Sequence, residues 1–387
     1  MLFRLWEAPA VVDDIARVDG YVVVARHDLV RRVLADPGTY RPDNALDAVT
    51  PIEVAAMRIL VRHGFRLPAT LANNGTHSHP VLRAAVAEAL HPTRVAVQRA
   101  WLTGVVRRRV ATLARRLVDG PVDLYADLAA DLPLLVLARL VELPTDDVRL
   151  VKDFSRAALE LFWAPLDGER QKHLAGLVGE YHARLRAFVR TAPGLVARLR
   201  EQATEDQVIG VLFFLLVAGQ ETTSQFLTLL LHRLAGEPAL LAGLARGTQG
   251  VEDVVEEGLR LVPPIETWRR VAARDTDLDG FEIRAGDSVV MWLAAAGRDK
   301  AVFSVPDEFV PGQHGSRRHL AFGAGAHRCL GAHLARMEAA VVVAETAPLL
   351  RGVRVVRAPY CPDNLSFRMP DAFVVARTGT GGAPQTR

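Results

Sequence analysis

Residues 321–331 read Ala321-Phe-Gly-Ala-Gly-Ala-His-Arg-Cys-Leu-Gly331, a glycine-rich loop that holds one cysteine directly before an expected helix over 332–345. Gly323 and Gly325 permit positive φ angles and the close approach of a flat ligand. The first turn of the helix supplies unpaired N–H groups and the positive end of a dipole, which favour a thiolate over a thiol. Cys329 therefore has the surroundings that a soft metal ligand needs.

The loop alone leaves other interpretations open. A lone cysteine is more often a small core residue than a ligand. A zinc site with His327 and His333 would lack a fourth protein ligand. A dinucleotide-binding loop would need a third glycine soon after Gly325, and a nucleophilic cysteine beside His327 would lack an orienting third residue.

The composition is that of a globular protein with enough apolar material to enclose a cofactor. Half of the 387 residues are hydrophobic and 24% are charged. No long polar or Pro/Gly-rich stretch divides the chain, so we expect a single domain over residues 1–377. The Gly- and Thr-rich tail, 378–387, is expected to be disordered because it cannot bury enough surface to offset its ordering entropy.

Charge and cysteine content limit the partners and the compartment. A formal net charge of +3 is small for this length and is not typical of a nucleic-acid-binding protein. Cys329 and Cys361 are too few for a disulfide framework, which favours a reducing compartment such as the cytoplasm. Arg4 and Glu7 precede any long apolar stretch, and the apolar run 208–218 is too short to span a bilayer. We expect a cytoplasmic monomer that binds neither nucleic acid nor membrane.

Hydrophobic periodicity predicts a mainly α fold with small β-sheets. The expected helices include 28–35, 100–117, 204–236 and 332–345. Strands are expected at 21–25, 353–356 and 372–376, with a hairpin within 279–291. Most of the chain from about 80 to 244 is expected to be helical.

The helix expected at 204–236 has clear ends. Thr204 and Gln207 form a capping box, while Gly236 and Pro238 supply the stop. About 30 residues at 1.5 Å per residue give a length of roughly 45 Å. An apolar helix of that length is expected to cross the core, so the polar cluster 218–223 at its middle needs a reason to be buried.

The cysteine loop resembles, at every defining position, the haem-binding signature of cytochromes P450, Phe322-Gly323-x-Gly325-x-His327-Arg328-Cys329-Leu330-Gly331. The resemblance implies the cytochrome P450 fold and a haem b cofactor whose iron is bound by the thiolate of Cys329. It also implies that Phe322 packs beside the sulfur and that Gly323 and Gly331 belong to the haem-binding loop.

The middle of the long helix is similar to the oxygen-binding kink of the same family. This similarity implies that Ala218 and Gly219 lie at the cofactor, with Gly219 loosening the helix. It implies catalytic roles for Glu221 and Thr222, which would bring protons from solvent. An isolated threonine could equally hydrogen-bond back to the preceding turn.

Charged residues elsewhere fit the same resemblance. Glu257 and Arg260, taken alone, are typical of a solvated surface pair, but they resemble the family's Glu-x-x-Arg pair, which has a structural role. Two buried haem propionates would need charge-assisted donors, and the family's donors correspond to His79, Arg83, Arg270 and His327. The matches extend from about residue 26 to residue 367.

The resemblance implies a monooxygenase that activates O2 to hydroxylate or epoxidise a small organic molecule, in secondary metabolism. The candidate substrate pocket consists of Leu215, Ala218, Ile265, Glu266, Leu365 and Ser366. Glu266 is unusual there, because it could pair with a basic or hydroxylated substrate, or else point to solvent.

No flavin or iron–sulfur motif is present in the chain, so electrons from NAD(P)H are expected to arrive through a ferredoxin reductase and a ferredoxin. A basic docking surface for an acidic ferredoxin is expected at Arg107, Arg108, Arg109, Arg328 and Arg336, although charged helices are often merely solvated.

Three rival functions stay open. They are a peroxide-driven haem-thiolate oxidase or cyclase, a phenol-coupling enzyme, and a non-catalytic haem sensor or carrier. The Glu221–Thr222 pair argues against the peroxide-driven enzyme. A sensor would normally be joined to an output domain, for which the chain has no evident room.

Overall fold

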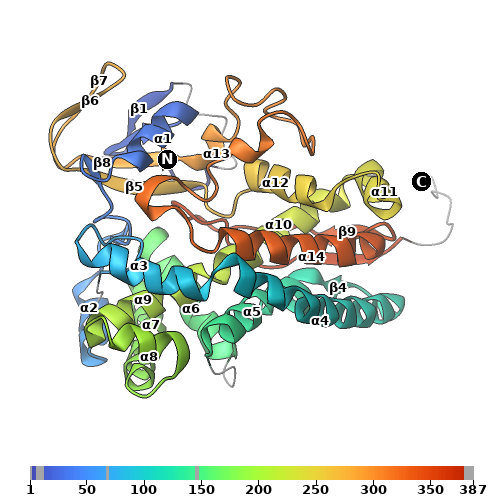
Figure 1. Ribbon diagram of the computed structural model, residues 1–387, viewed down its shortest axis with the longest axis horizontal. Coiled ribbons are helices and arrows are strands. Elements are labelled where there is room, and N and C mark those ends of the chain that lie inside the picture. The colour runs from blue at the N-terminus through green and yellow to red at the C-terminus, as the bar shows by residue number, and fades with distance from the viewer. Residues whose placement is uncertain (1, 6–12, 67–68, 144–147, 379–387) are drawn as a thin grey trace.

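The computed structural model describes residues 2–5, 13–66, 69–143 and 148–378. It confirms the mainly helical fold with small sheets (Figure 1). Helices α4 (Pro92–Asp119) and α14 (Ala332–Leu350) run side by side, and the larger sheet lies at the upper left of the view. Both helices are longer than expected. His91 and Pro92 begin α4 earlier, and α14 continues through Pro348.

The other helices surround this pair. In chain order they are α1 (His27–Ala35), α2 (Val54–Arg62), α3 (Ser78–Ala89), α5 (Leu132–Val141), α6 (Val148–Trp163), α7 (Gly168–Val189), α8 (Gly194–Arg200), α9 (Glu205–Ala218), α10 (Glu221–Ala235), α11 (Pro238–Arg246), α12 (Val251–Leu261) and α13 (Leu293–Ala296). Short turns of other helix types are η1 (Tyr125–Ala129), η2 (Ser316–Arg318) and η3 (Gly325–His327).

The strands form small sheets. One has the order β1-β2-β8-β5-β3, from β1 (Ile15–Val18), β2 (Tyr21–Val24), β8 (Ser288–Trp292), β5 (Thr267–Ala272) and β3 (Tyr40–Arg41). Another has the order β4-β10-β9, from β4 (Val122–Asp123), β10 (Val374–Arg377) and β9 (Val353–Arg357). A hairpin joins β6 (Thr276–Leu278) to β7 (Phe281–Ile283).

The hairpin expected within 279–291 is corrected by this topology. Asp279 and Gly280, both at positive φ, make the tight turn between β6 and β7. Strand β8 leaves the hairpin and pairs parallel with β2 and antiparallel with β5. The reason is burial, since Val289 and Val290 of β8 are fully enclosed and an edge position would expose their backbone.

The central helix expected at 204–236 is broken in two, at the place where the resemblance implied a kink loosened by Gly219. The capping box of Thr204 and Gln207 is confirmed at the start of α9, and α10 ends before Gly236. Between them Gln220 has a φ of −138°, outside the helical range. The carbonyl of Leu216 accepts from the side-chain Nε2 of Gln220 at 3.1 Å, so a side chain replaces a backbone donor at the break.

The unit Glu205–Ala235 is the one helical stretch, among the described residues, that is long and apolar enough to cross a membrane. Most of it is buried inside the protein. This unit is therefore the core helix that was expected, and its break lies in the interior of the protein.

The end of the chain was expected to be a disordered tail from residue 378. Thr378 is hydrogen-bonded to the carbonyl of Gly352, through its N–H at 2.9 Å and its hydroxyl at 3.0 Å. Residues 379–387 lie outside the described part of the chain. The single domain over 1–377 stays a prediction.

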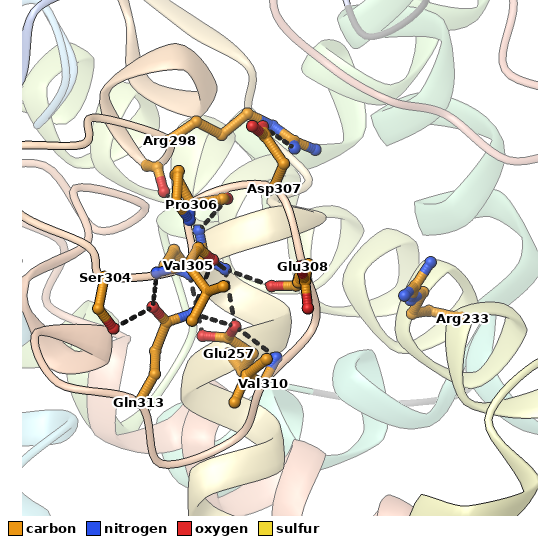
Figure 2. A network of polar contacts seen from close by, with 12 residues as sticks. Arg233, Glu257, Arg298, Ser304, Val305, Pro306, Asp307, Glu308, Val310 and Gln313 are labelled. Atoms are coloured by element: carbon orange, nitrogen blue, oxygen red, sulfur yellow. Dashed lines mark hydrogen bonds and ion pairs between the residues drawn. The ribbon is translucent and has the colours of Figure 1, made fainter.

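Glu257 and Arg260 of α12 are fully buried rather than solvated, and they connect α12 to the loop before the cysteine. Figure 2 shows Glu257 facing Val310 and Gln313, whose N–H and amide donate to its carboxylate at 2.9 and 2.7 Å. Arg260 donates to Glu257 at 2.7 Å and to the carbonyl of Gly297 at 2.8 Å. One buried ion pair thus holds several turns of a loop that has little secondary structure.

We predict that Glu257→Ala lowers the free energy of unfolding by about 3–5 kcal/mol, because it leaves the buried Arg260 guanidinium without its counter-ion. Thermal or urea unfolding measures the loss. The matched control is Asp307→Ala, which breaks the exposed pair with Arg298 in the same loop and should cost less than about 0.5 kcal/mol. Equal losses in the two variants would contradict the structural role of the buried pair.

Candidate active site and cofactor site

A cavity lies between the break in the central helix and the cysteine loop. Its walls come from α3, α9, α10, residues 264–270 and residues 321–331, and with its opening to solvent it encloses about 1450 Å³. Most of the lining side chains are apolar, including Leu71, Val86, Phe214, Leu215, Ile265 and Trp268. No aspartate or glutamate lines it among the described residues.

Backbone geometry brings the cysteine loop to this cavity. Gly325 has a φ of +68°, and a Cβ there would lie 2.4 Å from the carbonyl oxygen of Leu34, so only glycine fits. Gly323 also has positive φ, at +64°. The N–H of Cys329 donates to the carbonyl of Phe322 at 2.9 Å, which closes the loop and turns the thiol toward the cavity.

The electrostatics of Cys329 differ from the sequence-based expectation. Burial raises the pKa of its thiol above the ordinary value, although the N–H of Gly331 and the guanidinium groups of Arg83 and Arg336 lower it. The donors expected at the start of the helix are therefore present but outweighed. A thiolate at this position needs a further positive partner, which a bound metal ion supplies.

Cations gather at the edge of the cavity near this loop. Arg270 is buried, it donates only to the carbonyl of Arg269, and no carboxylate pairs with it in the described part of the chain. Burial lowers the pKa of Arg270 to about 10. Arg83 also lines the cavity, and burial lowers its pKa, while its NH2 donates to the carbonyl of Arg328 at 2.5 Å. Both guanidinium groups would gain from an anion.

Two histidines complete this edge. His327 lines the cavity, and its Nδ1–H donates to the carbonyl of Leu71 at 3.1 Å. Burial and the nearby His79 lower the pKa of His327 to about 4, so the ring is neutral until an anion favours its protonated form. His79 lies behind it, with ring centroids 4.2 Å apart, and the buried Nε2 of His79 has no partner within the part of the chain that the structure describes.

These residues fit a haem group. Cys329 supplies a sulfur ligand, the apolar walls accept a flat macrocycle, and Arg83 and Arg270 supply uncompensated charge for two carboxylates. The orphaned Nε2 of His79 is a further polar atom that the group's edge could satisfy.

Opposite the cysteine loop, the helix break brings small and polar residues to the cavity. Ala218, Gly219 and Thr222 all line it. The hydroxyl of Thr222 donates to the carbonyl of Ala218 at 2.9 Å, which is the local bond to the preceding turn that the sequence left as an alternative. Its lone pairs remain available to accept a proton donor from the cavity.

Glu221 does not line the cavity; it is fully buried beside it, facing α6. Its carboxylate pairs with Lys152, accepts from Ser155 Oγ at 3.1 Å and lies 3.8 Å from NH1 of Arg156. Burial disfavours the charged carboxylate, but Lys152 and Arg156 outweigh burial, so the pKa of Glu221 lies below its ordinary value. Glu221 is therefore an anion in this arrangement.

Sequence reasoning missed the α6 partners of Glu221. Lys152, Ser155 and Arg156 stand at i, i+3 and i+4, so they share one face of α6 with the apolar Val148 and Leu159. Polar residues on an apolar face were the available signal. What the sequence does not indicate is that this face meets Glu221 of a distant helix.

The candidate pocket residues divide into two groups. Leu215, Ala218 and Ile265 line the cavity as expected. Contrary to expectation, the structure does not place Glu266, Leu365 or Ser366 on its wall. The N–H of Glu266 donates to the carbonyl of Ser366 at 2.7 Å, so the two segments pair with each other behind the wall.

Glu266 also does not point to solvent. It is buried, with Oε1 3.6 Å from NH1 of Arg368, and burial raises the pKa of its carboxyl group although Arg368 lowers it. Trp268, two residues on, lines the cavity instead.

The chain is similar to known proteins of one family. The family model described as Cytochrome P450 matches residues 250–346. The 20-oxo-5-O-mycaminosyltylactone 23-monooxygenase of Streptomyces fradiae is 31% identical over 340 residues, which cover 85% of this chain and 77% of that enzyme. Cyclomarin C epoxidase CymV of Salinispora arenicola is 34% identical over 258 residues, covering 62% of this chain and 65% of the epoxidase.

A solved structure extends the similarity to the whole fold. Cytochrome P450 CREJ in complex with (4-ethylphenyl) dihydrogen phosphate superposes with a TM-score of 0.89 at 27% identity, covering 95% of this chain and 94% of that chain. Because the relatives align along most of the chain and the architecture is shared throughout, this protein belongs to the cytochrome P450 family and is one of its monooxygenases.

Proposed function

We propose that the protein holds haem b through Cys329 and hydroxylates or epoxidises a neutral, mainly apolar small molecule in the cytoplasm, as part of secondary metabolism. The single observation that carries the proposal is the cavity, which has a cysteine at one wall and an apolar wall with Thr222 opposite. When bound, haem supplies the oxygen-activating chemistry that amino-acid side chains lack. The monooxygenase and the epoxidase among the relatives support both reaction classes.

The charge of the lining supports a neutral substrate. Its arginines are Arg83 of α3, Arg270 of β5 and Arg328 of the cysteine loop. If haem propionates take Arg83 and Arg270, only Arg328 is left, and because it is exposed the buried wall keeps no cation for an anionic substrate. With no carboxylate on the wall, a cationic substrate would also lack a partner. Shape complementarity with apolar side chains then decides affinity.

Proton delivery is assigned to Thr222 and Glu221. Thr222 offers a hydroxyl to the cavity at the helix break, and Glu221 is its chain neighbour. Lys152 and Arg156 reach Glu221 from α6. The side chain of Lys152 is 11% exposed, so a proton from solvent can reach Glu221 through Lys152, and a rotation of the Glu221 side chain would present the proton to Thr222.

Electron supply is assigned to an acidic ferredoxin and its reductase. Of the arginines expected to form the docking surface, Arg107, Arg109 and Arg336 pair with Glu345, Asp131 and Glu256 of this chain. Arg108 and Arg328 are exposed and have no carboxylate partner among the described residues. These two side chains are the better candidates for contact with a partner, because they are exposed and are not held by a carboxylate of this chain's described part.

The function is tested on the haem-loaded protein. Wild type should show the carbon monoxide spectrum of a thiolate-ligated haem, and Cys329→Ser should lose it, because an alcohol is a weaker and harder ligand. Wild type should form product with a ferredoxin, its reductase and NAD(P)H. Thr222→Ala should lose most of this product, with peroxide-driven turnover less affected. Turnover with peroxide but not with the ferredoxin system would favour the peroxide-driven enzyme. No turnover in any of these assays would favour the non-catalytic sensor.

We predict that Glu221→Gln lowers kcat with ferredoxin by about 100-fold or more, because an amide cannot carry the proton. KM should change little, since Glu221 does not line the cavity. Steady-state kinetics and the solvent deuterium isotope effect measure the change. Glu237→Gln is the control, because it removes a carboxylate at the other end of α10, where Glu237 pairs with Arg233. A matching loss in the control would contradict the relay.

We predict that neutral apolar compounds shift the spin state of the ferric haem, while their carboxylate or phosphate analogues bind at least about 10-fold more weakly. The reason is that an anion would be desolvated against an apolar wall without a charge partner. Optical titration with matched ester and acid pairs gives the dissociation constants. Tighter binding of the acids would show that a cation of the cavity stays free for substrate.

A further inference from the structure

A cluster of three side chains lies under the cysteine loop and has no part in the mechanism above. Glu256 comes from α12, His319 follows η2, and Arg336 stands in the second turn of α14. None of the three lines the cavity. Arg336 donates from Nε to Oε1 of Glu256 at 2.5 Å and from NH2 to Oε2 at 3.1 Å. This is the paired geometry that fixes the plane of a guanidinium group.

His319 completes the cluster as a neutral donor. Its Nδ1 accepts from the N–H of Ala321 at 3.2 Å, so the ring proton resides on Nε2, which donates to Glu256 at 3.1 Å. Burial lowers the pKa of His319, in accord with a neutral ring. Glu256 and His319 are both almost fully buried, while Arg336 is 28% exposed. Glu256 thus holds one ring and one cation in fixed orientations.

Both of these groups meet the same aromatic side chain. The Cζ of Arg336 lies 4.5 Å from the ring centroid of Phe322, within the range of a cation–π contact. The His319 ring lies 5.8 Å from Phe322, at an interplanar angle of 50°. Phe322 in turn lines the cavity and accepts the N–H of Cys329 through its carbonyl at 2.9 Å. An unbroken series of contacts therefore connects Glu256 to the cysteine.

We infer that Glu256 is a positioning residue that holds Arg336 against Phe322 and so keeps a fixed positive charge beside Cys329. The inference rests on the proposed haem-thiolate function. It adds that Arg336 sets how strongly the sulfur of Cys329 would donate to the haem iron. A cation at short range in a protein interior stabilises negative charge on sulfur. The sulfur then donates less strongly to the iron, and the ferric/ferrous potential is higher than it would be without the cation.

The first test compares two arginines. Arg336→Ala should move the ferric/ferrous potential of the substrate-free holoenzyme to a more negative value, with the thiolate-type carbon monoxide spectrum retained. Arg336→Lys keeps the charge and should recover part of the shift. Arg317→Ala is the matched control, because Arg317 also pairs with a carboxylate of α12, Asp253 at 3.4 Å, but it is 64% exposed. Equal potentials in the Arg336→Ala and Arg317→Ala variants would overturn the inference.

The second test asks whether Glu256 acts by positioning Arg336 or only through its own negative charge. If Glu256 acts by holding Arg336, Glu256→Gln releases the cation and moves the potential in the same negative direction as Arg336→Ala. If Glu256 acts only as a negative charge, its removal moves the potential in the positive direction and overturns the positioning role. Asp253→Asn, one turn earlier on α12, is the control. Should Glu256→Gln not retain haem, Glu256→Asp takes its place, because it keeps the charge but shortens the side chain that holds Arg336; an unchanged potential in Glu256→Asp overturns the positioning role.

The inference and the proposed function fail differently. A wild-type holoenzyme without a thiolate spectrum would overturn the proposed function and this inference with it. A wild type with that spectrum, whose potential does not respond to Arg336→Ala beyond its control, would overturn the inference alone.

Discussion

The negative charge on one sulfur atom, that of Cys329 at the wall of the cavity, is the constraint on which the rest of the site depends. Protein atoms around Cys329 disfavour that charge and raise the pKa of the thiol, while Arg83, Arg328, Arg336 and the N–H of Gly331 oppose them. A metal ion shifts the balance to the thiolate. The glycines of the loop, the pairing of Phe322 with Cys329 and the cluster at Glu256 all hold the sulfur where such an ion can reach it.

Because a buried charge is costly without a partner, the buried charged residues fall into two groups, those with an ion-pair partner and those without one. Glu221, Glu256 and Glu257 each form an ion pair with an arginine or lysine. Glu338 of α14 is the opposite case, since both of its buried oxygens lack partners among the described residues and burial raises its pKa well above the ordinary value. Arg270 is a buried cation without a counter-ion in the described part of the chain. It lines the cavity, where an anionic group would stabilise its charge.

Helix α6 links the two sides of the catalytic space. Lys152 and Arg156 bring charge to Glu221 at the break of the central helix. At the end of the same helix, Trp163 stacks on Trp268 of the cavity wall, with ring centroids 6.2 Å apart. A movement of α6 would therefore change the surroundings of the proton path and the shape of the substrate wall together.

Sequence alone determined those features that depend on neighbouring residues. The loop glycines, the capping box at Thr204, the turn at Asp279 and Gly280 and the mainly helical class follow from local conformational preferences and periodicity. They are predictable because their physical causes lie within a few residues of chain. The similarity of the cysteine loop to a known signature supplied the cofactor.

Tertiary structure decided whatever depends on contacts between distant segments. Glu257 and Arg260 look like a surface pair in the sequence, but the packing of the loop 305–313 over α12 buries them completely. Likewise Glu266 and Ser366 pair with each other behind the cavity wall, and Glu221 turns to α6 instead of the cavity. The free energy of a buried polar group depends on which partners surround it, and those partners lie from a few tens to more than a hundred residues away along the chain.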